Sequence, residues 1–255
     1  MARIELDFHS DALGHAVSAV ILLPQNATTQ IGMTAERGEK RLRTLWLLHG
    51  LSDDHTIWSR RTSIERYAAD YGIAVVMPNG GRSWYTDMAH GERYYTFMTE
   101  ELPAVCRSFF CGMSEAREDN YIAGLSMGGY GALKIALRNP SRYAAAAAFS
   151  GALDVASYER MFGRESYWAD IFGDITQIAG SENDVYAVAE RLDPAAAPRL
   201  YISCGTEDGL LAANRRMRDL LAARGIPCTY SERPGNHNWA FWDTEIQKAL
   251  AFFFA

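Results

Sequence analysis

The stretch NYIAGLSMGGYGALK (Asn120–Lys134) places a single serine, Ser126, in a glycine-rich turn. Gly124 and Gly128 flank it with the spacing G-x-S-x-G. The apolar residues before the serine predict a strand, and the residues from Gly128 to Arg138 have helical spacing. A serine at such a strand–turn–helix junction stands on a turn too tight for a Cβ atom at the flanking positions. The stretch therefore supports the hypothesis that Ser126 is a nucleophile.

Strand-like and helix-like segments alternate along the whole chain. Apolar or alternating runs predict strands at residues 3–8, 16–24, 44–50, 73–78, 120–125, 143–151, 198–205 and 227–233. Amphipathic runs predict helices at residues 56–71, 95–110, 128–138, 212–224 and about 239–254, with Pro103 as a local irregularity. Because no internal repeat, low-complexity tract or linker interrupts this pattern, we expect one domain over residues 1–255.

The expected architecture is an α/β fold. The first two strands are expected to form an antiparallel hairpin. The strand–helix alternation after them implies right-handed crossovers and a mostly parallel central sheet. Runs such as residues 44–50 are apolar throughout, which suits a sheet with helices on both faces. In such a sheet the functional site lies at the carboxyl ends of the strands, where Ser126 is expected.

One segment departs from the alternation. Residues 153–191 are long and are interpreted as a small helical, cap-like insertion over the sheet. The segment contains five aromatic residues near its centre: Tyr158, Phe162, Tyr167, Trp168 and Phe172. They form either a packing cap without ligand contacts or an aromatic wall of a substrate pocket, for which Trp168 and Phe172 are the candidates.

Composition limits the classes of partner. The chain has 255 residues and a formal net charge of −6. Without a long basic run, neither nucleic acid nor an anionic membrane is an expected partner. The first residues lack the pattern of a secretory signal, and no apolar run approaches the length of a membrane span. The four cysteines lack metal-type spacing and are interpreted as reduced thiols of a cytoplasmic protein.

A serine nucleophile needs a base and an acid. A hydroxyl group attacks at neutral pH only when a base takes its proton, and enzymes with this turn place the acid and then the histidine after the serine. Asp208 follows an apolar strand in YISCGTEDGLL, and His237 precedes the last helix in RPGNHNWAFWD. Glu207, which adjoins Asp208, is the alternative acid. Asp193 is interpreted as a turn residue.

The remaining histidines are assigned other roles. His9, His15 and His90 lie in the opening hairpin or a polar loop and are interpreted as structural or solvated. His49 ends the strand in LLHGL, where the loop of an oxyanion hole is expected. We predict that its imidazole is buried and supports the loop. The two donors of the hole would then be the backbone N–H groups of Leu51 and Met127.

Residues 52–55, SDDH, resemble a set of metal ligands. Capping of the following helix by Ser or Asp accounts for them without a metal. The chain has no HExxH motif and no spaced Cys/His cluster, so no metal is expected.

Five motifs in one order resemble a known family. WLLHGLSDDHTIW, MPNGGRSWYTD, GLSMGGYGALK, CGTEDGLL and GNHNWAFW are spread over nearly the whole chain. In this it resembles the tributyrin esterases of the esterase D and S-formylglutathione hydrolase-like group of α/β hydrolases. The resemblance implies an α/β-hydrolase fold, no cofactor, small acyl esters as substrates and often a homo-oligomer.

The resemblance also implies roles for individual residues. Ser126 would be the nucleophile, His237 the general base and then acid, and Asp208 the residue that orients it. Trp84 and Tyr85 look like part of the pocket rim, although aromatic packing under a surface loop is the alternative for both.

The substrate stays open at this point. The group also includes carbohydrate acetyl esterases, feruloyl or cinnamoyl esterases and S-formylglutathione hydrolases, and related acyltransferases use the same three residues. A binding protein with a vestigial site is a third class, which the intact set of three residues argues against. The expected activity is that of a serine carboxylesterase acting on short-chain esters.

Overall fold

The computed structural model describes residues 1–27, 29, 31, 41–157 and 165–255. Its centre is an eight-stranded sheet with the order β1-β2-β4-β3-β5-β6-β7-β8. The strands are β1 (Ala2–Ser10), β2 (His15–Leu23), β3 (Thr44–Leu48), β4 (Ala74–Pro78), β5 (Asn120–Leu125), β6 (Ala145–Phe149), β7 (Arg199–Gly205) and β8 (Cys228–Arg233). β1 pairs antiparallel with β2, and β2 antiparallel with β4. All other pairs are parallel, so the predicted hairpin and mostly parallel sheet are confirmed.

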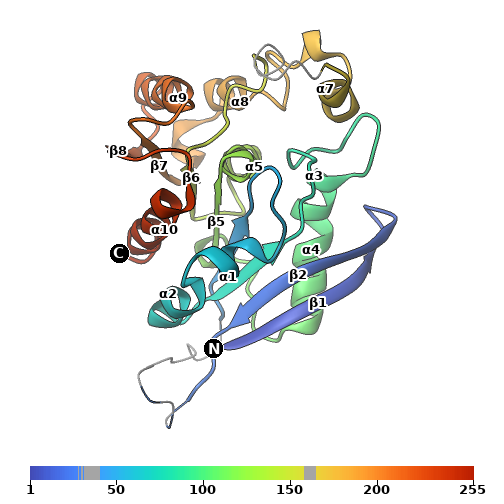
Figure 1. Cartoon of the computed structure of the whole chain (residues 1–255), viewed down its shortest axis with the longest axis vertical. Helices are drawn as coiled ribbons and strands as arrows, with labels where there is room; N and C mark the ends of the chain where they lie inside the picture. Colours follow the sequence, from blue (N-terminus) through green and yellow to red (C-terminus); the bar gives the residue numbers. More distant parts are fainter. Residues whose placement is uncertain (28, 30, 32–40, 158–164) are drawn as a thin grey trace.

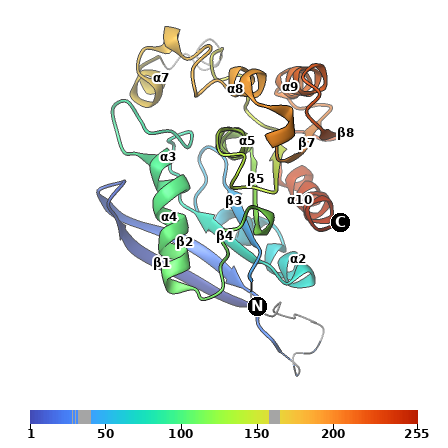
Figure 2. The ribbon, with the colours of Figure 1, turned by 180° about the vertical axis from the view of Figure 1, so that it is seen from behind.

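Helices cover both faces of the sheet, as predicted. One apolar cluster holds buried residues of α1 (Ile57–Arg61), α2 (Ile64–Tyr71) and α10 (Trp239–Phe254). The other holds buried residues of α4 (Leu102–Phe109), α5 (Met127–Arg138), α8 (Val185–Arg191) and α9 (Leu211–Ala223). Figures 1 and 2 show α5 close to the central strands and α10 beside the last ones. Strands β3 to β6 are buried along their whole length, which explains their continuous apolar sequences.

Two predicted helices are interrupted. The segment expected as one helix at 56–71 is divided into α1 and α2, because the extended backbone of Thr62 ends α1. The segment expected at 95–110 consists of α3 (Tyr94–Thr96), a π-helical turn (Phe97–Glu101) and α4, which has Pro103 in its first turn. Proline lacks an N–H group and is tolerated at that position. The irregularity predicted at Pro103 therefore starts a new helical segment.

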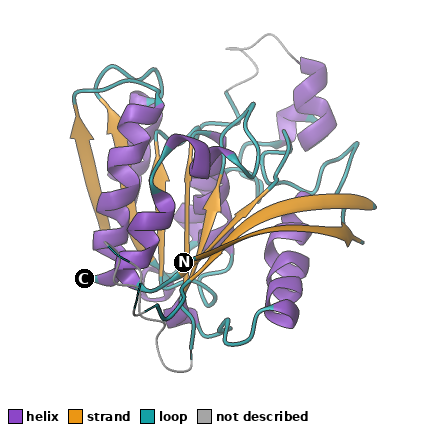
Figure 3. Ribbon diagram, turned by 60° about the horizontal axis from the view of Figure 1, so that its bottom comes forward, coloured by secondary structure: helices purple, strands orange, loops and turns teal. Residues whose placement is uncertain are grey.

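The opening hairpin leaves the body of the sheet. β1 and β2 extend well beyond the parallel strands, and α4 runs across them (Figures 1 and 3). Phe8 of β1 stacks on Phe97 with the ring centroids 6.1 Å apart. Glu101 receives hydrogen bonds from the hydroxyl of Ser10 and from the backbone N–H groups of Asp11 and Ala12. The π-helical turn thus holds the tip of the hairpin.

The insertion lies at one end of the molecule. α7 (Glu165–Phe172) and α8 appear at the top of Figure 1, whereas the N-terminus lies at the bottom. Tyr158 and Phe162, two of the five predicted aromatics, lie outside the described residues. Backbone hydrogen bonds from Ala89 and His90 to the end of α7 fasten it to the loop after β4. Among the helices that the structure describes, none is long and apolar enough to cross a membrane.

Candidate active site

Ser126 stands on a strained turn at the carboxyl end of β5. Its φ of 54° and ψ of −117° lie in a region that side chains other than glycine rarely occupy. Its N–H group donates to the carbonyl of Phe149 over 2.9 Å. A Cβ atom on Gly124 would collide with the backbone of Gly128, and one on Gly128 would collide with the carbonyl oxygens of Leu48 and His49, which explains the two glycines of the motif. The sequence thus folds into the predicted strand–turn–helix junction with the serine side chain at its apex.

Ser126, His237 and Asp208 form one hydrogen-bonded chain. The Oγ atom of Ser126 lies 3.0 Å from Nε2 of His237. The Nδ1 atom of the same ring lies 2.9 Å from Oδ2 of Asp208. When Nδ1 carries the proton and donates it to the carboxylate, Nε2 is free to accept from the serine hydroxyl. The three residues that the sequence nominated from three distant segments therefore meet at the carboxyl end of the sheet.

Asp208 is kept ionised in a buried position. Its side chain is 1% exposed. Burial raises the pKa of the carboxyl group, but hydrogen bonds from His237 and from the Leu210 N–H group lower it by more. The net pKa is below its usual value. An acceptor that stays charged holds the imidazole in one orientation and stabilises the imidazolium ion.

Glu207, the alternative acid, has a different partner. Its carboxylate accepts a hydrogen bond from the N–H group of Gly235, and its own N–H donates to the Gly235 carbonyl over 3.0 Å. The ring of His237 bonds to Asp208 instead. Glu207 therefore fastens the loop that carries the histidine.

The start of α10 holds His237 in place. Asn238 caps this helix, its side chain accepting from the Phe241 N–H over 3.1 Å. The ring of Trp242 meets the imidazole edge to face, with the centroids 4.8 Å apart and an interplanar angle of 89°. Because His237 lies between a capped helix and the loop held by Glu207, its side chain has a defined position.

The loop after β3 offers uncommitted donors beside the serine. Within the described part of the chain, the N–H groups of Leu51 and Met127 donate no hydrogen bond. A Cβ atom built on Gly50 would lie 3.6 Å from the Cβ atom of Ser126, so this loop passes next to the serine. The two N–H groups predicted as oxyanion donors therefore come from segments that adjoin the serine. Leu51 lies in the loop after β3, and Met127 directly follows the serine in the chain.

His49 supports this loop from behind, as predicted. Its side chain is 1% exposed, and its Nε2 atom accepts from the Gly80 N–H over 2.9 Å. The proton therefore lies on Nδ1, which donates to the Gly50 carbonyl over 2.8 Å. Burial lowers the pKa of this histidine to about 4. The imidazole is thus neutral at pH 7 and takes no part in the hydrogen-bonded chain of Ser126.

Acidification is expected to destabilise the fold through His49. An unfolded histidine takes up a proton near pH 6.5, whereas folded His49 does so only near pH 4. Over that interval the unfolded state binds more protons, so the free energy of unfolding falls by up to about 3 kcal/mol as the pH drops. Urea denaturation between pH 7.5 and 4.5 measures this loss. His49→Gln, whose amide oxygen can accept from Gly80, should show a flatter profile, and parallel profiles would contradict the prediction.

The predicted pocket aromatics are largely enclosed. Trp84 is 2% exposed, Trp168 is 1% exposed and Tyr85 has no exposed surface, whereas Phe172 is partly exposed. Trp84 packs on Trp168 with centroids 4.8 Å apart, and Trp168 stacks on Phe172 at 5.2 Å. The loop after β4 and α7 of the insertion thus share one aromatic cluster. The position of Tyr85 does not support a contact with substrate, and among the four predicted pocket aromatics Phe172 is the one that presents surface.

Among the described residues, the remaining polar candidates form no hydrogen bond with the side chains of Ser126, His237 or Asp208. His9, His15 and His90 are exposed, and Asp193 caps a short 3₁₀ turn, as predicted. The predicted capping of the following helix by Ser or Asp is wrong: the N-cap of α1 is Thr56, which makes no side-chain cap bond. Asp54 instead accepts from the N–H and hydroxyl of Thr56, in the turn before the helix. In the described segments no group of three or more His, Cys, Asp or Glu side chains is placed to hold a metal ion.

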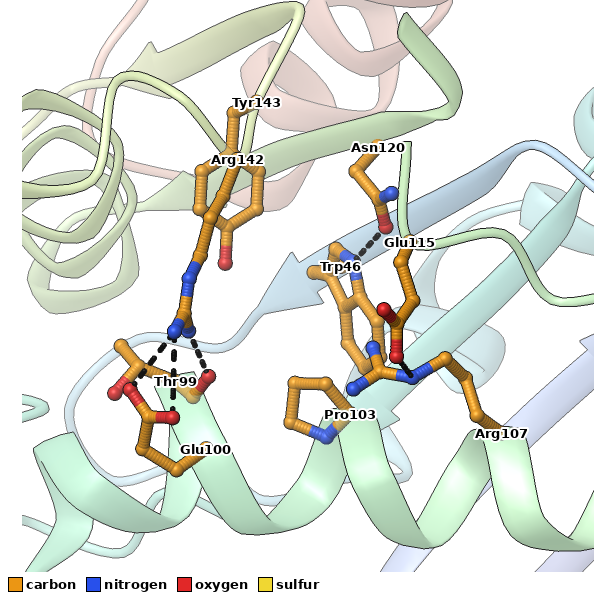
Figure 4. Close-up of a pocket in the computed structure, with 9 residues that line it drawn as sticks. All are labelled: Trp46, Thr99, Glu100, Pro103, Arg107, Glu115, Asn120, Arg142 and Tyr143. Atoms are coloured by element: carbon orange, nitrogen blue, oxygen red, sulfur yellow. Dashed lines mark hydrogen bonds and ion pairs between the residues drawn. The ribbon is translucent and has the colours of Figure 1, made fainter. Parts of the chain in front are cut away.

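A separate cavity of about 180 Å³ lies at the other end of β5 (Figure 4). It is lined by Trp46, Thr99, Glu100, Pro103, Arg107, Glu115, Asn120, Arg142 and Tyr143. Its charged groups pair with each other, Arg142 with Glu100 and Arg107 with Glu115. The cavity contains no member of the Ser126 chain and is therefore distinct from the candidate active site.

Comparison with known proteins places these features in a wider group. Residues 10–253 match the model of the Esterase family, described as "Putative esterase". The acetyl esterase of Caldicellulosiruptor saccharolyticus is 30% identical over 260 residues, which cover 98% of this chain and 97% of that protein.

Two solved structures from Staphylococcus aureus are each 34% identical to the chain. FphF, a fluorophosphonate-binding serine hydrolase, has a TM-score of 0.89 and covers 100% of this chain and 98% of its own. FrmB, an S-formylglutathione hydrolase, has a TM-score of 0.85 and covers 100% of this chain and 99% of its own. The fold of the chain is accordingly the α/β-hydrolase fold.

Proposed function

Because this chain belongs to the Esterase family and is a serine carboxylesterase, we propose that it hydrolyses short-chain acyl esters through an acyl-enzyme on Ser126. The observation that carries the proposal is the hydrogen-bonded chain from the Ser126 hydroxyl through His237 to Asp208. Its order along the sequence, serine, acid and histidine, is the order of α/β hydrolases.

The first half of the reaction transfers the acyl group to the enzyme. The Oγ atom of Ser126 forms a bond to the ester carbonyl carbon while Nε2 of His237 takes the hydroxyl proton. The carbonyl π electrons move to the oxygen, which becomes an oxyanion. When the oxyanion collapses, the bond to the alcohol oxygen breaks and His237 gives its proton to the leaving alcohol. Asp208 stabilises the imidazolium ion that exists between the two transfers.

The oxyanion is proposed to lie between the N–H groups of Leu51 and Met127. Met127 is the first residue of α5, where N–H groups have no partner within the helix and the helix dipole favours negative charge. Each donor of such a pair contributes about 3–4 kcal/mol to the stability of the transition state.

The second half of the reaction releases the acid. Water takes the place of the alcohol, His237 removes its proton, and the new hydroxyl oxygen attacks the acyl carbon. The collapse of the second oxyanion breaks the bond to Ser126, and His237 returns the proton to the serine oxygen. The carboxylic acid leaves, and the enzyme regains its starting state.

A short acyl group is proposed because most of the predicted pocket aromatics are buried and offer no surface to a long acyl chain. Trp84, Trp168 and Tyr85 are closed to solvent, whereas Tyr167 and Phe172 are partly exposed. The similarity to an acetyl esterase supports the same size of acyl group. Small esters from acetyl to butyryl are therefore the proposed substrates, with tributyrin as one example.

A series of p-nitrophenyl esters tests this proposal. We expect kcat/KM to be highest for acetate to butyrate and to fall at least tenfold by octanoate, since each methylene that finds no space loses its favourable transfer energy. The measurement is initial rate against concentration for each ester. A maximum at octanoate would contradict the short pocket, and inactivity across the series in folded protein would contradict the esterase proposal for simple esters.

Thioester hydrolysis is a second candidate, favoured by the 34% identity to an S-formylglutathione hydrolase. The same attack on a thioester carbonyl releases a thiol in place of an alcohol. Comparing kcat/KM for S-formylglutathione with that for p-nitrophenyl acetate separates the two candidates. A value for the thioester that exceeds the ester value would assign the chain to the thioester substrate.

We also propose that residues 1–255 form one domain. For its location we propose a reducing, cytoplasmic compartment. Burial raises the pKa of the Cys106, Cys204 and Cys228 thiols to about 12 each. Such thiols stay neutral, and all four cysteines, the exposed Cys111 included, are free thiols, as is usual in a compartment where cysteines remain reduced.

A further inference from the structure

Lys134 is a fully buried lysine on the helix that follows the nucleophile. Its side chain has no exposed surface. The Nζ atom donates to Oγ1 of Thr86 over 2.6 Å, to the carbonyl of Trp84 over 3.2 Å and to Oδ1 of Asn183 over 3.4 Å. Three acceptors thus meet the three donors of one ammonium group. The site is built around a cation or an amine, and its acceptors all belong to segments outside α5.

No carboxylate in the described part of the chain forms an ion pair with Lys134. Burial lowers the pKa of the amine well below its usual value, with Arg138 acting in the same direction. The ring of Tyr130 lies 4.9 Å from Nζ and adds a favourable face. A lysine kept at such a cost needs a role that an apolar side chain cannot fill.

The lysine holds a strained turn. Trp84 and Tyr85 have φ values of 54° and 50°, two successive non-glycine residues in the left-handed region. Each such residue costs about 1–3 kcal/mol and persists only where its surroundings fix it. The Thr86 hydroxyl donates to the Trp84 carbonyl over 3.0 Å, and Lys134 binds both groups. Its contacts therefore lie at the peptide bond between the two strained residues and at the residue that follows them.

The Trp84–Tyr85 turn also holds the loop at His49, which precedes the proposed oxyanion hole. The hydroxyl of Tyr85 donates to the carbonyl of His49 over 2.9 Å. The Tyr85 ring is fully buried, and a Cβ atom on Gly80 would lie 2.5 Å from it. A Cβ atom on Gly131 of α5 would collide with its other side. The ring is thus clamped, and its hydroxyl reaches the loop backbone from a fixed position.

We propose that Lys134 is a positioning residue for the oxyanion hole, acting through the Trp84–Tyr85 turn and the Tyr85 hydroxyl on the backbone at His49. The inference rests on the proposed function, because it assigns the Leu51 N–H, two residues after His49, to the oxyanion. The nucleophile helix carries both Met127 and Lys134. One rigid element therefore sets the position of one oxyanion donor directly and of the other through the turn.

Tyr85→Phe removes the last link and keeps the ring. We expect kcat for p-nitrophenyl acetate to fall about tenfold to a hundredfold, since a small displacement of an aligned group has effects of that size. KM should stay within about twofold, because the donor acts mainly on the transition state. Binding of a trifluoromethyl ketone, whose tetrahedral adduct places an oxyanion in the hole, should weaken by the same factor as kcat/KM.

Tyr121→Phe is the matched control. Its hydroxyl also donates to a backbone carbonyl, that of Glu118 over 2.9 Å, but at the amino end of β5. This variant should keep the wild-type kcat. Equal losses in the two variants, or an unchanged kcat in Tyr85→Phe, would overturn the proposal.

Lys134→Met tests the first link of the same chain. The methionine fills most of the space and removes all three donors. We expect a loss of kcat similar to that of Tyr85→Phe, and a double variant no worse than about twofold below the poorer single one, because both act on the same loop. Losses that multiply would overturn the proposal. If Lys134→Met does not fold, Thr86→Val removes the nearest acceptor and takes its place in the cycle.

Labelling separates the failure of this inference from that of the proposed function. A fluorophosphonate that labels wild-type protein at Ser126 and abolishes its activity supports the serine esterase. With that result in hand, an unaffected Tyr85→Phe overturns only the role of Lys134. Absence of labelling and of activity in folded wild-type protein overturns both.

Discussion

Ser126→Ala is expected to lower kcat/KM for p-nitrophenyl acetate by about 10⁴-fold to 10⁶-fold, the range found when a nucleophile of this kind is removed. Alanine keeps a Cβ atom at the strained φ of 54° but removes the Oγ atom that lies 3.0 Å from His237. The acyl-enzyme then cannot form. Initial rates at high enzyme concentration, beside a no-enzyme blank, measure the remaining activity.

The same position offers a test of the strain. Ser126→Gly also lacks the nucleophile, but glycine adopts a positive φ without the steric cost. We expect the glycine variant to be inactive and about 1 kcal/mol more stable than the alanine variant in urea denaturation. Activity of either variant near that of the wild type, in protein shown to be folded, would refute Ser126 as the nucleophile.

Asp208→Asn is expected to lower kcat by about 10³-fold to 10⁴-fold while the fold is kept. The carboxylate accepts the proton of His237 Nδ1 over 2.9 Å. An amide can present its NH₂ group there, which favours the tautomer whose Nε2 carries the proton. That nitrogen can no longer accept from the Ser126 hydroxyl.

Glu207→Gln is the matched control, because it makes the same chemical change at the adjacent residue. The Gln side chain retains an oxygen that can accept from the Gly235 N–H. We expect a loss of kcat below about tenfold. A larger loss for Glu207→Gln than for Asp208→Asn would exchange the two assignments. Steady-state kinetics of both variants, with circular dichroism to show that each is folded, decide the question.

The parts of the fold that the sequence predicted well are those with a local signature. Strands β3 to β6 are buried on both faces, so their sequences are apolar apart from the first residues of β3 and β5, and this pattern predicts strands. The amphipathic pattern predicts a helix at about 239–254, and α10 spans Trp239–Phe254. The turn at Ser126 was predictable because G-x-S-x-G stands between a strand and a helix.

The parts that the sequence did not reveal depend on contacts between distant segments. The sequence around Trp84 and Tyr85 does not predict their two positive φ values, because a positive φ is normally expected at glycine. The enclosure of Trp84 and Trp168 follows from the docking of α7 on the loop after β4, which no local pattern encodes. Lys134 could have been singled out as a charged residue among the apolar positions of its helix, but its acceptors are far away in the chain.

The clamp around Tyr85 bears on how this protein family can vary. A methyl group at Gly80 or at Gly131 would take the space of the tyrosine ring. Side chains at positions 80, 85 and 131 therefore compete for one space, although the three residues are far apart in the sequence. Homologues with a large ring at the position of Tyr85 should have glycine at positions 80 and 131. Homologues that have lost either glycine should carry a small side chain at position 85. Drift at any one of these positions is constrained by the other two.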